Sequence, residues 1–338
     1  MEKFIIKHIL YSICLIFGLF NTMLSYGQDP QFSQFFANSL YLNPALTGNT
    51  TEYRLATTYR NQWPSIPGAF VSTTAAFDYN IEKANSGVGL LFSRDKAGSG
   101  GLSFTNIGLS YAYFVKLNQK VSVRAGMRFS YTSRRVDESR LVFGDQIARG
   151  GASSTIESLQ EGVDYADIST GFLLSHEQKY WFGASFDHVN TPDNSLIGFQ
   201  SELPLKLSVH GGWNFLIEEK RVISNPTTLR LMFSYKSQQD WDQLDIGGYY
   251  EKNNIFFGAW YRGLPGIKSY KGLANNDAVV LLVGYEVGDI KIGYSYDITI
   301  SRLVTETGGA HEISLIFETA SMRKKRKKRK FIVPCAKF

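Results

Sequence analysis

Large apolar residues alternate with small or polar residues over ten or more positions in several stretches of this sequence. Residues 107–117 show the pattern clearly, because odd positions are large and apolar while even positions are mostly small or charged. Successive side chains of a β-strand point to opposite faces, so this stretch predicts a strand with one apolar and one polar face. Residues 121–132 repeat the pattern directly afterwards.

A closed barrel in lipid accommodates all of these faces, with the apolar side chains outward and the polar ones inward. A soluble sheet would need a second layer, and no helical pattern supplies one. The mature region has no apolar run of about 18 residues, which excludes a helical membrane protein. We therefore predict an all-β fold, a transmembrane antiparallel β-barrel of about 14 strands. The predicted strands are 53–60, 69–82, 86–96, 102–117, 119–136, 165–176, 179–189, 203–217, 227–238, 242–252, 254–262, 277–287, 289–300 and 309–318.

The links between these strands alternate in length. Tight links fall at 83–85, 118, 177–178, 253 and 288, and longer links fall at 61–68, 97–101, 137–164, 190–202, 263–276 and 301–308. Two links depart from the alternation, since 217–226 is long for a turn and 239–241 is short for a loop. Outer-membrane barrels have short periplasmic turns and longer external loops, so both termini are predicted to be periplasmic in a Gram-negative cell outer membrane.

The first 27 residues have the pattern of a cleaved signal peptide. Lys3 and Lys7 precede an apolar stretch from Ile9 to Phe20, and small residues end the segment at Gly27. The predicted organisation is a signal peptide (1–27), a periplasmic or luminal N-terminal segment (28–52), an outer-membrane β-barrel (53–318) and a basic periplasmic tail (319–338).

The net charge of +6 is concentrated in the tail, where eight consecutive basic residues occupy positions 323–330. Without the tail the mature chain is slightly acidic, so the basic balance does not indicate nucleic-acid binding. Two interpretations of the run remain open. It is a solvated charge run, or it lies against anionic headgroups at about 1 kcal/mol per basic residue or against an acidic periplasmic partner.

Strand parity places a set of cations inside the predicted barrel. A ring of such charges can select anions, whereas pairing with luminal acids would serve stability. An anion-preferring diffusion porin is therefore the alternative function. The charged residues predicted to lie in the lumen are Arg54, Arg60, Arg124, Arg128, Arg230 and Lys291.

Three short motifs stand outside the alternation. Phe32-Ser33-Gln34-Phe35 is followed by Asn43-Pro44-Ala45 and Gly48, in a segment too apolar for a free tail. It caps or enters the barrel, or it rests on the periplasmic rim. Tyr59-Arg60-Asn61-Gln62-Trp63 ends the first predicted strand. Phe143-Gly144-Asp145-Gln146 lies in the longest loop, where the Gly-Asp pair suits a tight turn that folds the loop back over the lumen.

These motifs, in this order behind a signal peptide, resemble the PorP/SprF family of Bacteroidetes outer-membrane proteins. The resemblance spans nearly the whole predicted barrel. It implies a non-enzymatic role in type IX secretion and gliding motility, beside other type IX components. It further implies binding of a secreted partner, the C-terminal signal domain of an adhesin, and its delivery or anchoring at the cell surface. The basic tail is not part of the family pattern.

The contact surface expected for this partner is the external rim. Its loops carry aromatic residues of the kind that dominate binding energies. The partner-binding residues predicted there are Trp63, Phe143, Asp145, Phe199 and Tyr270.

Enzyme chemistry finds little support in the sequence. The mature histidines are His176, His188, His210 and His311, scattered over separate strands or turns. No HExxH, GxSxG, P-loop or paired-cysteine motif is present. No catalytic residue, metal site or cofactor is predicted, and outer-membrane lipid is the expected surrounding.

Overall fold

The structure is a computed structural model. It describes residues 29–151, 155, 160, 162–177, 179–198, 200–218, 227–264, 269–270, 273–300 and 307–319. The predicted signal peptide, Phe199 and the basic run 323–330 lie outside the described residues.

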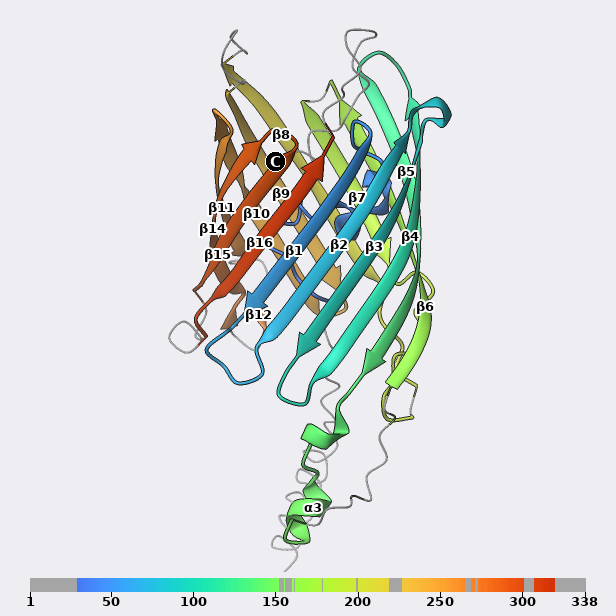
Figure 1. The fold of residues 1–338 in the computed structure, drawn as a ribbon, viewed down its shortest axis with the longest axis vertical. Helices are drawn as coiled ribbons and strands as arrows, with labels where there is room; N and C mark the ends of the chain where they lie inside the picture. The colour runs from blue at the N-terminus through green and yellow to red at the C-terminus, as the bar shows by residue number, and fades with distance from the viewer. Residues whose placement is uncertain are drawn as a thin grey trace, which may run out of the picture.

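Fourteen antiparallel strands form a closed barrel, as predicted, and the ring closes where β1 pairs with β16 (Figure 1). Each long alternating stretch became one strand, with boundaries within a few residues of the prediction. The barrel strands are β1 (Tyr53–Gln62), β2 (Phe70–Ile81), β3 (Ser86–Ala97), β4 (Leu102–Lys116), β5 (Val121–Arg135), β6 (Gly162–His176), β7 (Tyr180–Asp187), β8 (Lys206–Glu218), β9 (Thr227–Gln238), β10 (Trp241–Lys252), β11 (Ile255–Gly263), β14 (Asn276–Val287), β15 (Ile290–Thr299) and β16 (Ala310–Glu318).

The remaining elements are short and are not part of the ring of strands. They are the helices α2 (Ser39–Leu42) and α3 (Gly144–Ala148), the 3-10 turns η1 (Pro44–Leu46), η2 (Glu82–Ala84) and η3 (Glu138–Arg140), and the two-residue strands β12 (Ser269–Tyr270) and β13 (Leu273–Ala274). In the described part of the chain, no helix is both long and apolar enough to cross a bilayer.

The two rims of the barrel differ. Short connections gather at the rim drawn at the top of Figure 1, here called the turn rim. Thr319 donates its backbone N–H to Tyr53 there at 3.2 Å, so the two ends of the barrel chain are neighbours. Longer connections, including the one that carries α3, gather at the opposite rim, here called the loop rim (Figure 1).

Side chains on the two faces of the strands differ as the alternation predicted. Outward positions are large, apolar and exposed on the isolated chain, as Leu109 and Phe129 illustrate. Inward positions are mostly small or polar along β1 to β6, where Thr58, Ser110 and Ser130 are buried. Lipid contact accounts for the first set and a filled interior for the second.

The lumen is not polar throughout, and this departs from the expected interior. A buried apolar cluster lines the inner face of β7, β9 to β11 and β14, where Trp181, Phe256 and Trp260 point inward. Phe35 and Phe36, from before the first strand, belong to the same cluster. An apolar inner wall is stable only where something apolar covers it, and the N-terminal segment provides that cover.

Candidate functional site

Residues 29–50, here called the plug, lie inside the barrel. Figure 1 shows this blue segment within the ring of strands. Nearly every residue from Phe32 to Thr50 is buried. A fourteen-stranded barrel has a lumen wider than its own side chains fill, and the plug occupies that space.

The first anchor of the plug is the Ser33-Gln34 pair near the loop rim. The backbone N–H groups of Ser33 and Gln34 donate to the two carboxylate oxygens of Glu312 at 2.7 and 2.9 Å. The Gln34 side chain donates to Ser295 at 3.1 Å and accepts from Ser314. The Phe-Ser-Gln motif therefore bonds to the last two strands of the barrel.

Two arginines complete this anchor. Arg60 and Arg262 both donate to the hydroxyl oxygen of Ser33, at 2.7 and 2.8 Å. Both also donate to Asp297, at 2.8 and 2.9 Å, and Arg262 donates to Asp245 at 2.7 Å. All four charged side chains are nearly fully buried. Removing one member of such a cluster leaves the others buried and unpaired, which costs about 3–5 kcal/mol.

The second anchor is the Asn43–Gly48 stretch near the turn rim, where the plug backbone touches the strands. A Cβ on Gly126 would lie 2.4 Å from the carbonyl oxygen of Pro44, and one on Gly87 would lie 2.4 Å from that of Thr47. Gly48 has a φ of +67°, a conformation that favours glycine. This close approach explains why the Asn-Pro-Ala motif ends in a glycine.

Asn43 fixes the same stretch through its side chain. Its amide nitrogen donates to the carbonyl oxygens of Phe172 and Ala184, at 3.0 and 3.2 Å, and lies 3.1 Å from Nε2 of the buried His210. Its amide oxygen accepts from the N–H of Ala45 at 2.8 Å, which begins the turn η1. Asn43 thus joins the plug to β6, β7 and β8 at one point.

Three of the predicted luminal cations also hold the plug. Arg124 donates to the carbonyl oxygens of Ala45 and Thr47 at 3.0 and 2.7 Å. Arg128 donates to the carbonyl oxygen of Leu40 at 2.7 Å. Arg54 acts indirectly, because it pairs with Asp78 at 2.9 Å and Asp78 accepts from the plug.

The backbone N–H of Gly48, in the plug, donates to Asp78 at 2.8 Å. The last two predicted cations pair with acids on neighbouring strands, Arg230 with Glu251 and Lys291 with Glu286, both at 3.1 Å. Arg60, described above, is likewise paired. The six cations are therefore bound to acids or to the plug and do not form a ring of free charges around an open pore.

A charged cluster holds the start of the plug. Asp29 lies 3.0 Å from Nε2 of His188, and the Lys206 ammonium donates to the same carboxylate. Nδ1 of His188 lies 3.0 Å from Asp167. Burial alone would lower the pKa of His188, but the carboxylates of Asp29 and Asp167 outweigh it and raise that pKa to about 10. Burial would raise the pKa of Asp29, yet Lys206 and His188 hold it well below its usual value.

On the loop rim, Trp63 packs against its own barrel. Its ring makes an edge contact with Phe70 at 5.5 Å between centroids, and its backbone N–H donates to Gly309 at 2.8 Å. Its φ of +59° marks the sharp turn out of β1. The ring is only half-buried, but it is not a freely projecting anchor.

Phe143 and Asp145 lie on the projecting loop around α3. The N–H of Phe143 donates to the Gln146 side chain at 2.8 Å, and Asp145 pairs with Arg149 and accepts from Thr155 at 2.7 Å. The Gly-Asp pair thus begins a short helix rather than forming an isolated turn. Figure 1 shows α3 extending away from the barrel, so the expectation that this motif folds the loop back over the lumen is wrong.

Tyr270 belongs to the small β12–β13 hairpin, where its backbone pairs with Leu273. Phe199 lies outside the described residues. The described partner-binding candidates therefore sit on three different loops of one rim.

Several residues of the plug site were not named as site residues from the sequence. Ser33, Asn43, Arg262, Asp297 and Glu312 carry the two anchors. The available signal was the set of large inward-facing residues that break the alternation, since an apolar inner wall requires an apolar occupant. In the described part of the chain, no group of three or more His, Cys, Asp or Glu side chains is arranged to hold a metal ion.

Comparisons with known proteins identify the family. The toluene transporter TbuX of Ralstonia pickettii matches 83% of this chain and 93% of its own, with 14% identity and a TM-score of 0.48. The toluene transporter TodX of Pseudomonas putida (82% and 91%, 12% identity, TM-score 0.46) and Omp33 of Acinetobacter baumannii (81% and 100%, 8% identity, TM-score 0.44) are similar to a like degree. These likenesses are too weak to bear on function.

No curated protein matches the sequence significantly. The family described as "Type IX secretion system membrane protein PorP/SprF" matches residues 24–317, which include the plug and almost the whole barrel. The motifs of the plug and of the first strand, which meet in the lumen, lie within this range. The chain therefore belongs to the PorP/SprF family of type IX secretion system membrane proteins.

Proposed function

We propose that this protein binds a secreted type IX partner, an adhesin's C-terminal signal domain, at the loop rim and delivers or anchors it at the cell surface. The family and the barrel fold are those of a secretion-system membrane protein of the outer membrane, not those of a known enzyme class. Both termini of the barrel are proposed to face the periplasm, because the longer connections share the opposite rim.

The observation that carries the proposal is the contrast between a filled lumen and a projecting loop. The plug leaves no free ring of cations for anion passage, which argues against a diffusion porin. A partner must then be bound at a rim rather than threaded through. Val142 and Ile147, beside and within α3, are 72% and 67% exposed on a segment that extends beyond the strands. Apolar side chains exposed outside the lipid belt are typical of protein interaction sites.

The test replaces these two side chains with aspartate in the cell. Val142→Asp with Ile147→Asp should reduce surface display of the secreted partner and its recovery with the barrel from native outer membranes, as measured by surface labelling and mass spectrometry of co-purified proteins. The matched control is Ser139→Asp with Arg140→Gln, which makes the same change of two charges on the same loop, removes no apolar side chain and leaves the Asp145–Arg149 pair of α3 in place.

Barrel folding must be preserved in both variants, as shown by a heat-sensitive shift in electrophoretic mobility. Unchanged partner display and recovery in the apolar variant, with the barrel folded, would remove the proposed contact surface. Equal losses in both variants would point to loop charge rather than to the apolar pair.

A further inference from the structure

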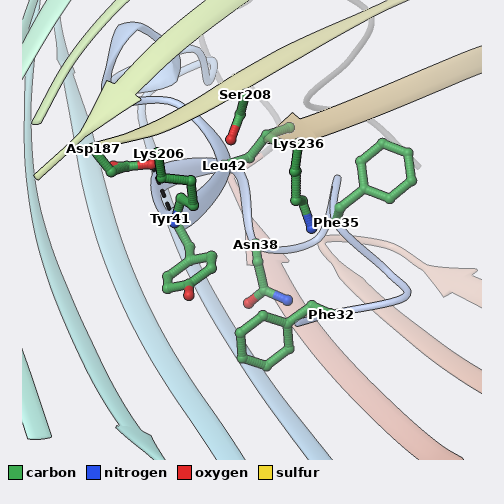
Figure 2. Close-up of a pocket in the computed structure, with 9 residues that line it drawn as sticks. All are labelled: Phe32, Phe35, Asn38, Tyr41, Leu42, Asp187, Lys206, Ser208 and Lys236. Carbon is green, nitrogen blue, oxygen red and sulfur yellow. Dashed lines mark ion pairs between the residues drawn. The ribbon is translucent and has the colours of Figure 1, made fainter. Parts of the chain in front are cut away.

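The plug fills the lumen so closely that little space remains beside it. Figure 2 shows its contact with β7 to β9, where Phe35 and Leu42 of the plug line the same space as Lys206 and Lys236 of the wall. That space measures about 20 Å³, which is enough for one water molecule. A larger ligand has no room at this contact, whereas the outer face of the barrel is open.

Cations are rare on the outer face. Among the outward positions of the described strands, arginine or lysine stands at four, which are Arg94 and Lys96 of β3, Arg135 of β5 and Lys252 of β10. Lys252 lies by itself at the turn rim. The other three lie at the loop-rim ends of β3 and β5, which both pair with β4. These three side chains are here called the basic patch.

Strand pairing brings the basic patch together. Lys96 lies opposite Ser103 of β4, and Ser103 lies opposite Arg135 of β5. Neighbouring strands are about 4.8 Å apart, so the backbones of Lys96 and Arg135 are separated by roughly 10 Å. Arg94 is two residues from Lys96 on the same face, at about 7 Å. Long side chains at these separations can reach one ligand.

Two of the three cations have no partner within the described chain. Arg135 pairs with Asp164 at 2.7 Å. Arg94 and Lys96 are exposed, and neither makes a hydrogen bond or an ion pair with any residue that the structure describes. Asp95, between them in the sequence, faces the lumen and therefore does not neutralise them. The basic patch thus presents two positive charges to the outside of the barrel.

The basic patch lies where the apolar outer face ends. Along β3 the outward residue next to Arg94 is Phe92, and along β4 the outward residue next to Thr105 is Ile107. Both apolar side chains are exposed on the isolated chain, as lipid contact requires. A cation on this face is costly at mid-membrane and tolerated near the interface. Arg94 and Lys96 therefore lie at the level of the lipid headgroups on the loop-rim side.

We propose that the basic patch binds the phosphate of a lipid headgroup in the leaflet on the loop-rim side, namely a phosphate monoester of lipid A. Arginine can bind a phosphate through two parallel hydrogen bonds, and lysine adds a point charge. Thr105 and Ser103, opposite Arg94 and Lys96, supply hydroxyl donors. A phosphate monoester carries nearly two negative charges, which match the two unpaired cations better than the single charge of a phosphodiester does.

The choice of lipid A rests on the external position proposed above for the loop rim, since lipid A belongs to the external leaflet of an outer membrane. Binding of a phosphate monoester by Arg94 and Lys96 does not depend on that orientation. It rests on the register of β3 to β5 and on the end of the apolar face.

The test is a binding measurement on the full mature chain in detergent micelles, with lipid A as the probe and native mass spectrometry as the readout. The wild type should bind lipid A at least about tenfold more tightly than fully dephosphorylated lipid A. Arg94→Gln with Lys96→Gln should remove most of this difference, whereas Arg94→Lys with Lys96→Arg should retain it. The control is Lys83→Gln with Lys252→Gln, which removes two exposed cations at the turn rim and should leave binding unchanged.

Equal binding of lipid A and its dephosphorylated form, or undiminished binding by a folded protein with Arg94→Gln and Lys96→Gln, would overturn the proposal. An equal loss in the control would also overturn it, because general charge attraction would then explain the binding. Displacement of lipid A by millimolar inorganic phosphate would show that the ligand is free phosphate and not a lipid. The measurement needs no secreted partner, so its failure is distinguishable from a failure of the proposed role in secretion.

Discussion

The plug and the projecting loop around α3 are both long irregular segments, yet they are built in opposite ways. The plug is buried, and its bonds reach strands far away in the sequence, as the contacts of Ser33 with Asp297 and Glu312 show. The described bonds of the loop are mostly local, such as those of Asp145 with Arg149 and Thr155. Two of the three motifs that mark the family thus make their contacts inside the barrel.

This difference indicates which of the two segments can bind a partner without giving up contacts within the barrel. A segment held by buried ion pairs and close backbone contacts cannot be displaced without leaving charges unpaired. A segment with exposed apolar side chains and local bonds can accept a partner without losing internal contacts. Substitutions in the plug should therefore change stability and permeability, whereas substitutions in the loop should change partner binding.

Deleting residues 31–48 should have the largest effect on the barrel. The emptied lumen would be wide enough for water, so steady conductance should appear in planar bilayers where the intact protein shows little. Loss of the buried rings of Phe35 and Phe36 should lower the free energy of unfolding by roughly 1.5–3 kcal/mol for each ring. Deleting residues 141–151 from the loop is the control and should leave both conductance and thermal stability unchanged. Low conductance after removal of the plug would contradict its role as the filling of the lumen.

Asp297→Ala should have the second-largest effect, because it removes an acceptor that Arg60, Arg262 and Ser33 share. We expect a loss of about 3–5 kcal/mol in the free energy of unfolding, measured by denaturant titration in micelles. The control is Asp164→Ala, whose pair with Arg135 is exposed and should be worth about 0–1 kcal/mol. Similar losses in the two variants would show that the anchor is no stronger than a surface pair.

Gly126→Ala and Gly144→Ala make the same chemical change in the two regions. A Cβ at Gly126 would lie 2.4 Å from Pro44, whereas one at Gly144 would meet nothing within 4 Å. The added methyl group of Gly126→Ala should crowd the plug and lower the free energy of unfolding by about 1–3 kcal/mol. The Gly144→Ala variant should unfold at the wild-type midpoint. If both variants unfold like the wild type, the second anchor is not tightly packed.

His188→Gln should have the smallest effect and should be visible mainly through pH. The pKa of His188 is raised from 6.5 to about 10. Its contribution to stability is therefore complete below about pH 6.5 and is lost as the pH rises through about 10. We expect the wild type to lose stability between pH 6.5 and 10.5 as the His188 imidazolium loses its proton, while Lys206 still holds Asp29. The variant should show a flatter profile, and parallel profiles would exclude His188 as a source of this dependence.

Strand positions were predictable from the sequence because one physical constraint, lipid outside and a filled interior, acts on every second residue. Each strand of the ring carries this signal by itself, as residues 107–117 do. The closed ring and its strand number follow from adding such segments together.

The plug was less predictable because its contacts are not periodic. The sequence left open whether residues 28–52 enter the barrel or rest on its rim. The answer depends on side chains such as Trp181, Phe256 and Trp260, which face inward and form the apolar wall that the plug covers. Each looks like an ordinary aromatic of a barrel strand when taken alone, and it marks an apolar inner wall only when its position in the alternation is counted along the whole strand.

The rim residues were the least predictable, since a loop contact depends on backbone geometry that no local pattern specifies. Trp63 appeared to be a free aromatic, but its ring packs on Phe70. The motif of residues 143–146 begins a helix that projects away from the barrel.

The first anchor also has a consequence for how the protein is assembled. Ser33 and Gln34 bond to Arg60 of β1 and to Glu312 of β16, the two strands whose pairing closes the ring. These strands come from opposite ends of the barrel sequence, so no connecting loop joins them and only noncovalent contacts hold their seam. The plug contacts both strands from within the lumen, so it links the first strand to the last across the seam and should help to keep the ring closed.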